Sequence, residues 1–118
     1  MKKHQEMVKR LVKDPEAILS NTNERDCHLV HMALGIAGEA GELVDAIKKH
    51  TIYQKTLDIE NVIEELGDLE FYMEGLRSAL KITRDETLKA NIKKLSKRYK
   101  NFRYTDKQAI NRKDKKKV

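Results

Sequence analysis

The sequence has one cysteine, one proline and no tryptophan, and aromatic residues make up only 5% of its 118 residues. The single cysteine, Cys27, excludes an internal disulfide and a cysteine-based zinc site, and we expect its thiol to be buried as a small hydrophobic group. No stretch approaches 18 uncharged apolar residues, and the first 14 residues lack the apolar core of a signal peptide. We therefore expect a cytoplasmic protein without a membrane segment.

The basic excess of the chain is concentrated at its C-terminal end. Residues 93–118 contain 12 Lys/Arg and 2 Asp/Glu, whereas residues 1–92 contain 13 and 17, so the formal net charge of +6 describes neither part. A basic end can bind nucleic acid or small phosphate compounds, or it can be a solvated tail. The length predicts a single domain, residues 1–104, followed by a basic tail, residues 105–118.

The apolar residues recur at three- and four-residue steps, which predicts helices, and no alternating strand pattern or internal repeat is present. We expect four helices, at residues 2–19 with an interruption near Pro15, 24–50, 58–80 and 83–99, and a mainly extended end with a short helical turn. Short connections between helices favour an all-α, antiparallel four-helix bundle. The many apolar helix faces predict an oligomer.

Two acidic pairs fall within these expected helices. Glu39 and Glu42 are three residues apart, as are Glu65 and Asp68, so each pair shares one helix face. If the two helices pack antiparallel, the pairs can face each other and form a cluster that a hard cation such as Mg²⁺, with Mn²⁺ as a substitute, would neutralise. The alternative is that all four are solvated surface acids.

Glycines accompany both acidic pairs. Gly35, Gly38 and Gly41 repeat every three residues, and Gly67 precedes Asp68. Each glycine costs a helix about 1 kcal/mol relative to alanine, so their presence requires a reason. They either allow a backbone or a flat ligand to come close, or they serve tight helix packing alone.

Further polar residues could contact a ligand. Asn91 and Lys94 are three residues apart, and their amide and ammonium groups suit phosphate oxygens. Arg98 continues the same side of the helix. Tyr72 lies one turn beyond the second acidic pair and can stack on a base or donate its hydroxyl group. The alternatives are ordinary exposed lysines and a core tyrosine. His31 is either structural or part of a pocket mouth.

Three segments together resemble the MazG-like all-α nucleoside triphosphate pyrophosphohydrolases, most closely the small single-domain members of bacteria and their phages. The segments are HMALGIAGEAGELVDAIKKH, ENVIEELGDLEFYMEGL and LKANIKKLSKRY, within residues 28–104. Any one of them alone would be weak evidence, but the paired acidic motifs and the third segment form a specific combination.

The resemblance implies a function and a set of site residues. It implies hydrolysis of nucleoside triphosphates between the α and β phosphates, giving a monophosphate and pyrophosphate, as in cleaning of the nucleotide pool. It also implies a dimer or tetramer in the cytoplasm of a bacterium or a phage-infected cell. By resemblance, the catalytic Mg²⁺ ligands are Glu39, Glu42, Glu65 and Asp68, the triphosphate is bound by Asn91 and Lys94, and Tyr72 lies against the nucleotide. The C-terminal segment resembles phage-type members in which Arg112 and Lys115 could reach phosphates.

Some positions depart from the family pattern and other functions remain open. Glu70 stands where relatives usually have an apolar residue, and Gln54-Lys55 replaces a more usual turn, which leaves substrate choice open. One rival is a non-enzymatic helical bundle that binds nucleic acid through its basic tail, although we do not expect nucleic acid as a partner. Phosphoribosyl-ATP pyrophosphohydrolase is a second rival. A di-iron bundle is disfavoured because no glutamate has a histidine three residues later.

Overall fold

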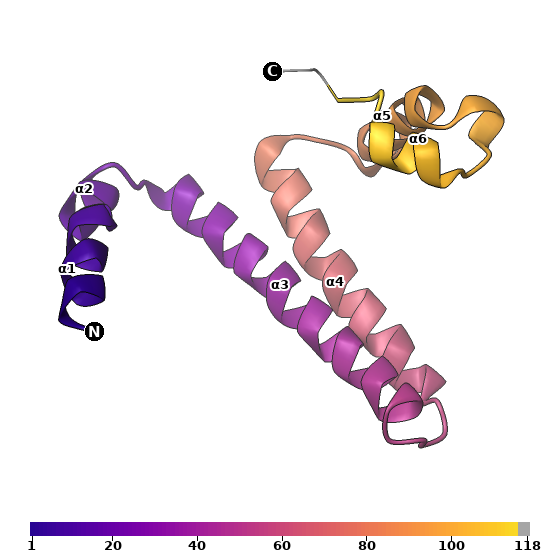
Figure 1. The fold of residues 1–118 in the computed structure, drawn as a ribbon, viewed down its shortest axis with the longest axis horizontal. Helices are drawn as coiled ribbons and strands as arrows, with labels where there is room; N and C mark the ends of the chain where they lie inside the picture. The colour runs from indigo at the N-terminus through magenta and orange to yellow at the C-terminus, as the bar shows by residue number, and fades with distance from the viewer. Residues whose placement is uncertain (116–118) are drawn as a thin grey trace. The chain divides into compact units, whose positions relative to one another are not determined.

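The computed structural model describes residues 1–115, and these residues contain helices and no strands. The chain divides into two compact units, Met1–Met73 and Glu74–Val118, and the boundary falls within one long helix. Figure 1 shows the helices along the chain. The all-helical class expected from the sequence is confirmed for the described residues. The division into a domain of residues 1–104 and a tail of residues 105–118 stays a prediction.

Pro15 interrupts the first helical region at the expected place. Helix α1 covers Lys2–Leu11, and helix α2 covers Pro15–Ser20. Proline lacks an amide hydrogen and disfavours helix in the residue before it, but it fits the first turn of a helix. The Asp14 side chain caps α2 by accepting a hydrogen bond from the Glu16 amide at 3.1 Å. Residues within one helical turn of Pro15 therefore signal both the end of α1 and the start of α2.

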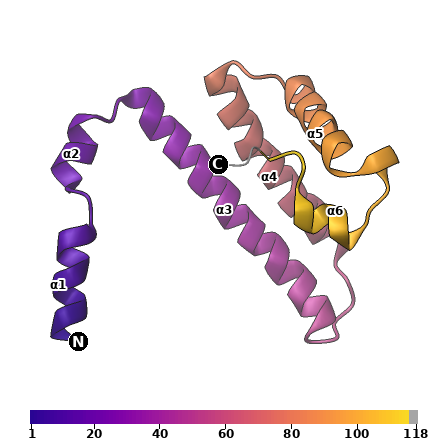
Figure 2. The same ribbon diagram turned by 45° about the horizontal axis from the view of Figure 1, so that its top comes forward.

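Two long helices form the main part of the first unit. Helix α3 covers Glu24–Thr51, and helix α4 covers Ile59–Leu80. Asn23 and Asp26 form a capping box at the start of α3, and Asp58 accepts a hydrogen bond from the Asn61 amide at the start of α4. As far as Met73, α4 runs antiparallel beside α3 in both Figure 1 and Figure 2.

The described chain buries few apolar side chains. Met32 and Ala46, both on α3, are the buried hydrophobic residues within residues 1–115. Many large apolar side chains are exposed, including Leu19 at 76%, Leu34 at 66%, Val44 at 64% and Phe71 at 68%. A single chain therefore leaves much of its apolar surface in contact with water, which is unfavourable for an isolated monomer.

The second unit contains one long helix and two short helical segments beyond it. Helix α5 covers Arg84–Arg98 and begins with the expected capping box of Thr83 and Glu86. A 3-10 helix, η1, covers Lys100–Phe102, and helix α6 covers Asp106–Asn111. The chain end was expected to be mainly extended with a short helical turn. The expectation of extended chain was wrong for Lys100–Phe102 and Asp106–Asn111, which are helical, whereas Arg103 and Thr105 have extended backbone. Side-chain hydrogen bonds between distant residues fold this segment, and the helical period does not reveal them.

Within residues 1–115, none of the helices combines the length with the apolar composition that a membrane span needs.

Candidate metal centre and nucleotide site

Three carboxylates from two helices meet in the first unit. Glu39 on α3 and Glu65 and Asp68 on α4 each offer an oxygen atom, and these atoms all lie within 4.8 Å of one another. The three-residue step between Glu65 and Asp68 places both on one face of α4, and the antiparallel neighbour supplies Glu39. Three anionic oxygens at this separation match the ligands that Mg²⁺ and other hard divalent cations prefer.

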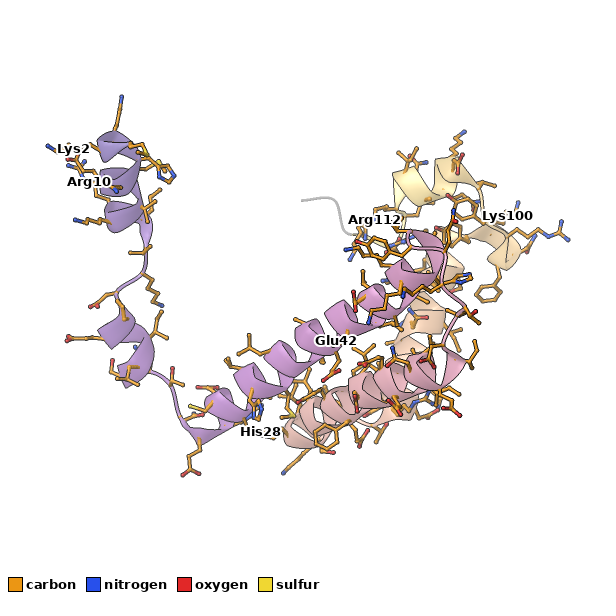
Figure 3. All side chains as sticks on the ribbon, turned by 90° about the horizontal axis from the view of Figure 1, so that it is seen from below. Lys2, Arg10, His28, Glu42, Lys100 and Arg112 are labelled. Carbon is orange, nitrogen blue, oxygen red and sulfur yellow. The ribbon has the colours of Figure 1, made fainter. Side chains whose placement is uncertain are left out.

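The fourth predicted acid, Glu42, lies outside this close group. Its side chain is exposed, one turn further along α3 than Glu39, and Figure 3 labels it on that helix. Its negative charge nevertheless contributes to the raised pKa of Glu65. The structure therefore brings three of the four predicted acids into direct proximity and leaves Glu42 beside them.

Glu65 is the member of the cluster whose carboxyl group has a raised pKa and an oxygen atom without a hydrogen-bond partner among the described residues. The pKa of its carboxyl group is raised first by a hydrogen bond with the Glu39 carboxyl group, then by burial, and then by the charges of Glu39, Asp68 and Glu42. Its Oε2 atom is buried and has no hydrogen-bond partner, the only such side-chain atom found within residues 1–115. A buried carboxylate oxygen without a partner is costly, and a bound cation would remove that cost.

Tyr72 packs against the helix that supplies Glu39. A Cβ atom added at Gly35 would collide with the Tyr72 ring, so glycine at this position makes room for the tyrosine. The ring also meets Phe71 edge-on, with centroids 5.1 Å apart, and His31 at 6.3 Å. The half-buried Tyr72 is thus held one turn beyond Asp68, on the helix that carries two of the clustered acids.

The other glycines of this region face open space. A Cβ atom at Gly38, Gly41 or Gly67 would meet no heavy atom within 4 Å. The packing explanation therefore accounts for Gly35 within the single chain and does not account for these three. Among residues 1–115 of the single chain, no neighbouring atom requires glycine at these three positions.

The predicted phosphate-binding residues lie in the second unit. Asn91 and Lys94 are both exposed on α5. Arg98 differs, because its Nε and Nη2 atoms donate to the two carboxylate oxygens of Asp114 at 2.6 and 2.9 Å. The Asp114 side chain is only 1% exposed, so this is a shielded bidentate pair. Arg98 continues the side of α5 that carries Asn91 and Lys94, and the structure pairs its guanidinium group with Asp114.

An apolar groove of about 540 Å³ lies between α2 and the start of α3. Its lining includes Ile18, Leu19, Val30 and Leu34, with Cys27 and His31 among the remaining residues. Cys27 was expected to be buried, but it is exposed in the structure. His31 links the two regions, since it lines this groove and also contacts the Tyr72 ring.

Sequence reasoning missed the partners that only folding brings together. It did not identify Asp114 as the partner of Arg98, because the two residues are 16 positions apart and no helical period relates them. It also did not pair His31 with Tyr72. A spacing signal existed for Tyr72 alone, which lies four residues after Asp68 and therefore on the same face of α4.

The comparison with protein families gives the class of this protein. A family model described as the MazG nucleotide pyrophosphohydrolase domain matches residues 28–103, which is more than half of the 118-residue chain. The matched region contains all four acids, Tyr72, Asn91 and Lys94. The chain belongs to the MazG family. Neither the search of curated proteins nor that of solved structures found a match.

Proposed function

We propose that this protein is a Mg²⁺-dependent nucleoside triphosphate pyrophosphohydrolase that cleaves between the α and β phosphates to give a nucleoside monophosphate and pyrophosphate. The observation that carries the proposal is the cluster of Glu39, Glu65 and Asp68, in which Glu65 Oε2 is buried without a partner. Its place in a domain of the MazG family makes a nucleotide the natural substrate.

The acidic residues have distinct proposed roles. Glu39, Glu65 and Asp68 would hold the divalent cations, and Glu42, exposed beside them, would complete the ligand set. Bound Mg²⁺ supplies positive charge for the triphosphate and lowers the pKa of a water molecule. Glu39 or Glu42 would orient that water or accept its proton. Glu65 is less suited to this task, because it would already serve as a buried ligand.

The remaining residues would bind the nucleotide. Asn91 and Lys94 carry an amide and an ammonium group, which suit the phosphates that leave as pyrophosphate. Tyr72, held in place by Gly35, would lie against the base or sugar. Catalysis by such a site consists mainly of positioning and electrostatic stabilisation, since phosphoryl transfer requires little covalent chemistry from the protein.

We further propose that the four long helical regions form an antiparallel bundle that assembles as a dimer or tetramer in the cytoplasm. Exposed Leu34, Val44 and Phe71 support the assembly, because an isolated chain would leave these side chains in water. The open space at Gly38, Gly41 and Gly67 is consistent with a second chain or a nucleotide coming close to α3 and α4.

The direct test is pyrophosphate release from ribo- and deoxynucleoside triphosphates and from phosphoribosyl-ATP, with Mg²⁺ or Mn²⁺. We expect release by the wild type, loss in Asp68→Asn, and retention in Glu64→Gln, which removes one charge from an exposed neighbouring position of α4. If no nucleotide releases pyrophosphate and Mg²⁺ does not raise the melting temperature, both the proposed reaction and the proposed metal site are overturned. Release from phosphoribosyl-ATP alone would assign the reaction to the rival branch.

A further inference from the structure

The C-terminal segment is a folded structure with a strongly one-sided charge. Residues 93–115 contain ten Lys/Arg and two Asp/Glu. Asp114 is paired with Arg98, and Asp106 accepts a hydrogen bond from the Tyr104 hydroxyl group at 2.8 Å. Both acids of the segment are therefore engaged within the segment itself. The other cationic side chains, which include Lys100, Arg103 and Lys107, are exposed.

Hydrogen bonds of one side chain hold this segment in shape. Gln108 on α6 accepts from the Lys100 amide at 2.7 Å, and its own amide group donates to the Arg103 carbonyl oxygen and to the Thr105 hydroxyl oxygen. Together with the Arg98–Asp114 pair, these bonds fix the chain between α5 and α6. Figure 3 labels Lys100, the first residue of η1, and Arg112, which directly follows α6. The exposed cations are thus presented by an ordered backbone.

Two aromatic rings are exposed among these cations. Phe102 is 67% exposed and Tyr104 is 69% exposed, and Arg103 lies between them in the sequence. Tyr104 leans on Tyr99 with ring centroids 5.6 Å apart, so one of its faces is supported. Phe102 has a positive φ of 51°, a conformation that is rare for a bulky residue. Exposed rings flanked by cations are the combination that single-stranded nucleic acids require, because phosphates pair with the cations and bases stack on the rings.

We propose that the exposed cations and rings of residues 100–107, which are Lys100, Phe102, Arg103, Tyr104 and Lys107, bind single-stranded nucleic acid. A duplex would satisfy the cations but would leave the rings unused, since its bases are already stacked. These residues begin at η1, before the predicted tail of residues 105–118, and the proposal departs from the expectation that nucleic acid is not a partner. The proposal is independent of the pyrophosphohydrolase activity, because an oligonucleotide without a triphosphate offers no bond for that reaction.

The test measures the fluorescence anisotropy of labelled dT20 and rU20, and of a 20-base-pair duplex, across a range of salt concentrations. We expect both single strands to bind more tightly than the duplex. The logarithm of the binding constant falls as the logarithm of the salt concentration rises, and each phosphate neutralised on a single strand contributes roughly 0.7 to the steepness of this fall. The variant Lys100→Gln/Arg103→Gln/Lys107→Gln should therefore make the fall less steep by about 2. The matched control, Lys2→Gln/Lys3→Gln/Lys9→Gln on α1, removes the same charge from exposed positions and should leave the steepness unchanged.

A second pair of variants separates stacking from charge. Phe102→Leu keeps an apolar side chain without a π-face and should weaken single-strand binding by about fivefold or more, whereas Phe102→Tyr should retain it. Pyrophosphate release and the melting temperature serve as folding controls for all four variants. Absence of oligonucleotide binding, equal loss in the α1 control, or equal binding of duplex with no effect of Phe102→Leu would each overturn the proposal. A rise in the KM for the nucleotide in the triple variant, without oligonucleotide binding in the wild type, would assign the cations to the substrate instead.

Discussion

The two compact units of the chain differ in charge. Met1–Met73 carries 9 Lys/Arg and 14 Asp/Glu, whereas Glu74–Val118 carries 16 Lys/Arg and 5 Asp/Glu. In the first unit, acids from two helices are crowded together, and the buried oxygen of Glu65 is left without a partner. In the basic segment of the second unit, the acids Asp106 and Asp114 each have a partner within the segment.

The difference lies in how the acids are balanced, since within residues 1–115 those clustered in the first unit lack a positive partner and those in the basic segment of the second unit are paired. Crowded carboxylates repel one another and resist desolvation, so an external positive charge would stabilise the cluster of the first unit. In the second unit, the paired acids stabilise the fold and leave the exposed cations available to external negative charge. This contrast in charge motivates both proposals, a metal site in the first unit and a polyanion-binding segment in the second.

Removing the negative charge of Glu65, whose Oε2 atom is buried, should have the largest effect. We expect Glu65→Gln to lower pyrophosphate release by more than about 100-fold, since even residues that only orient metal ligands typically contribute 10- to 100-fold. The rise in melting temperature with Mg²⁺ should disappear in the same variant. Glu64→Gln is the matched control, because it makes the same chemical change at the preceding, exposed position. Full activity in Glu65→Gln would remove this residue from the metal site.

Filling the space at Gly35 should cause the next largest change. The new methyl group of Gly35→Ala would collide with the Tyr72 ring, and overpacking of this kind costs about 1–3 kcal/mol. We expect a lower free energy of unfolding in urea, even though alanine is the better helix former. In a Tyr72→Ala background, where the ring is absent, the same Gly35→Ala change should no longer destabilise the protein. An unchanged stability in Gly35→Ala would show that Tyr72 moves away freely.

Breaking the Arg98–Asp114 pair should loosen the end of the second unit. We expect Asp114→Asn to speed amide hydrogen exchange in residues 100–115 and to leave exchange in α3 unchanged. Asp106→Asn is the matched control, because its carboxylate accepts a hydrogen bond from the exposed Tyr104 and should have the smaller effect. Equal exchange in both variants would show that the pair does not hold the segment.

Acid should weaken the same pair within a defined range of pH. The hydrogen bonds from Arg98 lower the pKa of Asp114 from its ordinary value of 3.8 to about 2. Because the folded carboxyl group binds its proton less readily than the unfolded one, the pair stabilises the segment fully above about pH 3.8 and loses this contribution as the pH falls toward 2. Amide chemical shifts near Gln108, followed by NMR, should change in that range in the wild type and not in Asp114→Asn.

Filling the space at Gly38 should have the smallest effect, with the opposite sign to Gly35→Ala. No heavy atom lies within 4 Å of the added Cβ atom, so Gly38→Ala should stabilise the helix by about 0.5–1 kcal/mol. Urea unfolding of the two alanine variants side by side gives the comparison. Loss of stability in Gly38→Ala would show that another chain occupies the space in the assembled protein. Loss of activity with unchanged stability would indicate the nucleotide instead.

The local features of the fold were predictable from the sequence. Pro15 marked the break between α1 and α2, Thr83 and Glu86 marked the start of α5, and a three- and four-residue period marked α3 and α4. The three-residue spacing also indicated that Glu65 and Asp68 share a face. These signals could be recognised because helix caps and helix faces depend on residues within about one turn of each other.

The tertiary structure alone decided which of these features meet. It placed Glu39 against Glu65, left one oxygen of Glu65 without a partner, packed Tyr72 over Gly35, and joined Arg98 to Asp114. It also exposed Cys27, which composition had suggested would be buried. Each of these outcomes depends on contacts between residues distant in the sequence. A helical period fixes the face on which a side chain lies, but the packing of the helices determines what that face contacts.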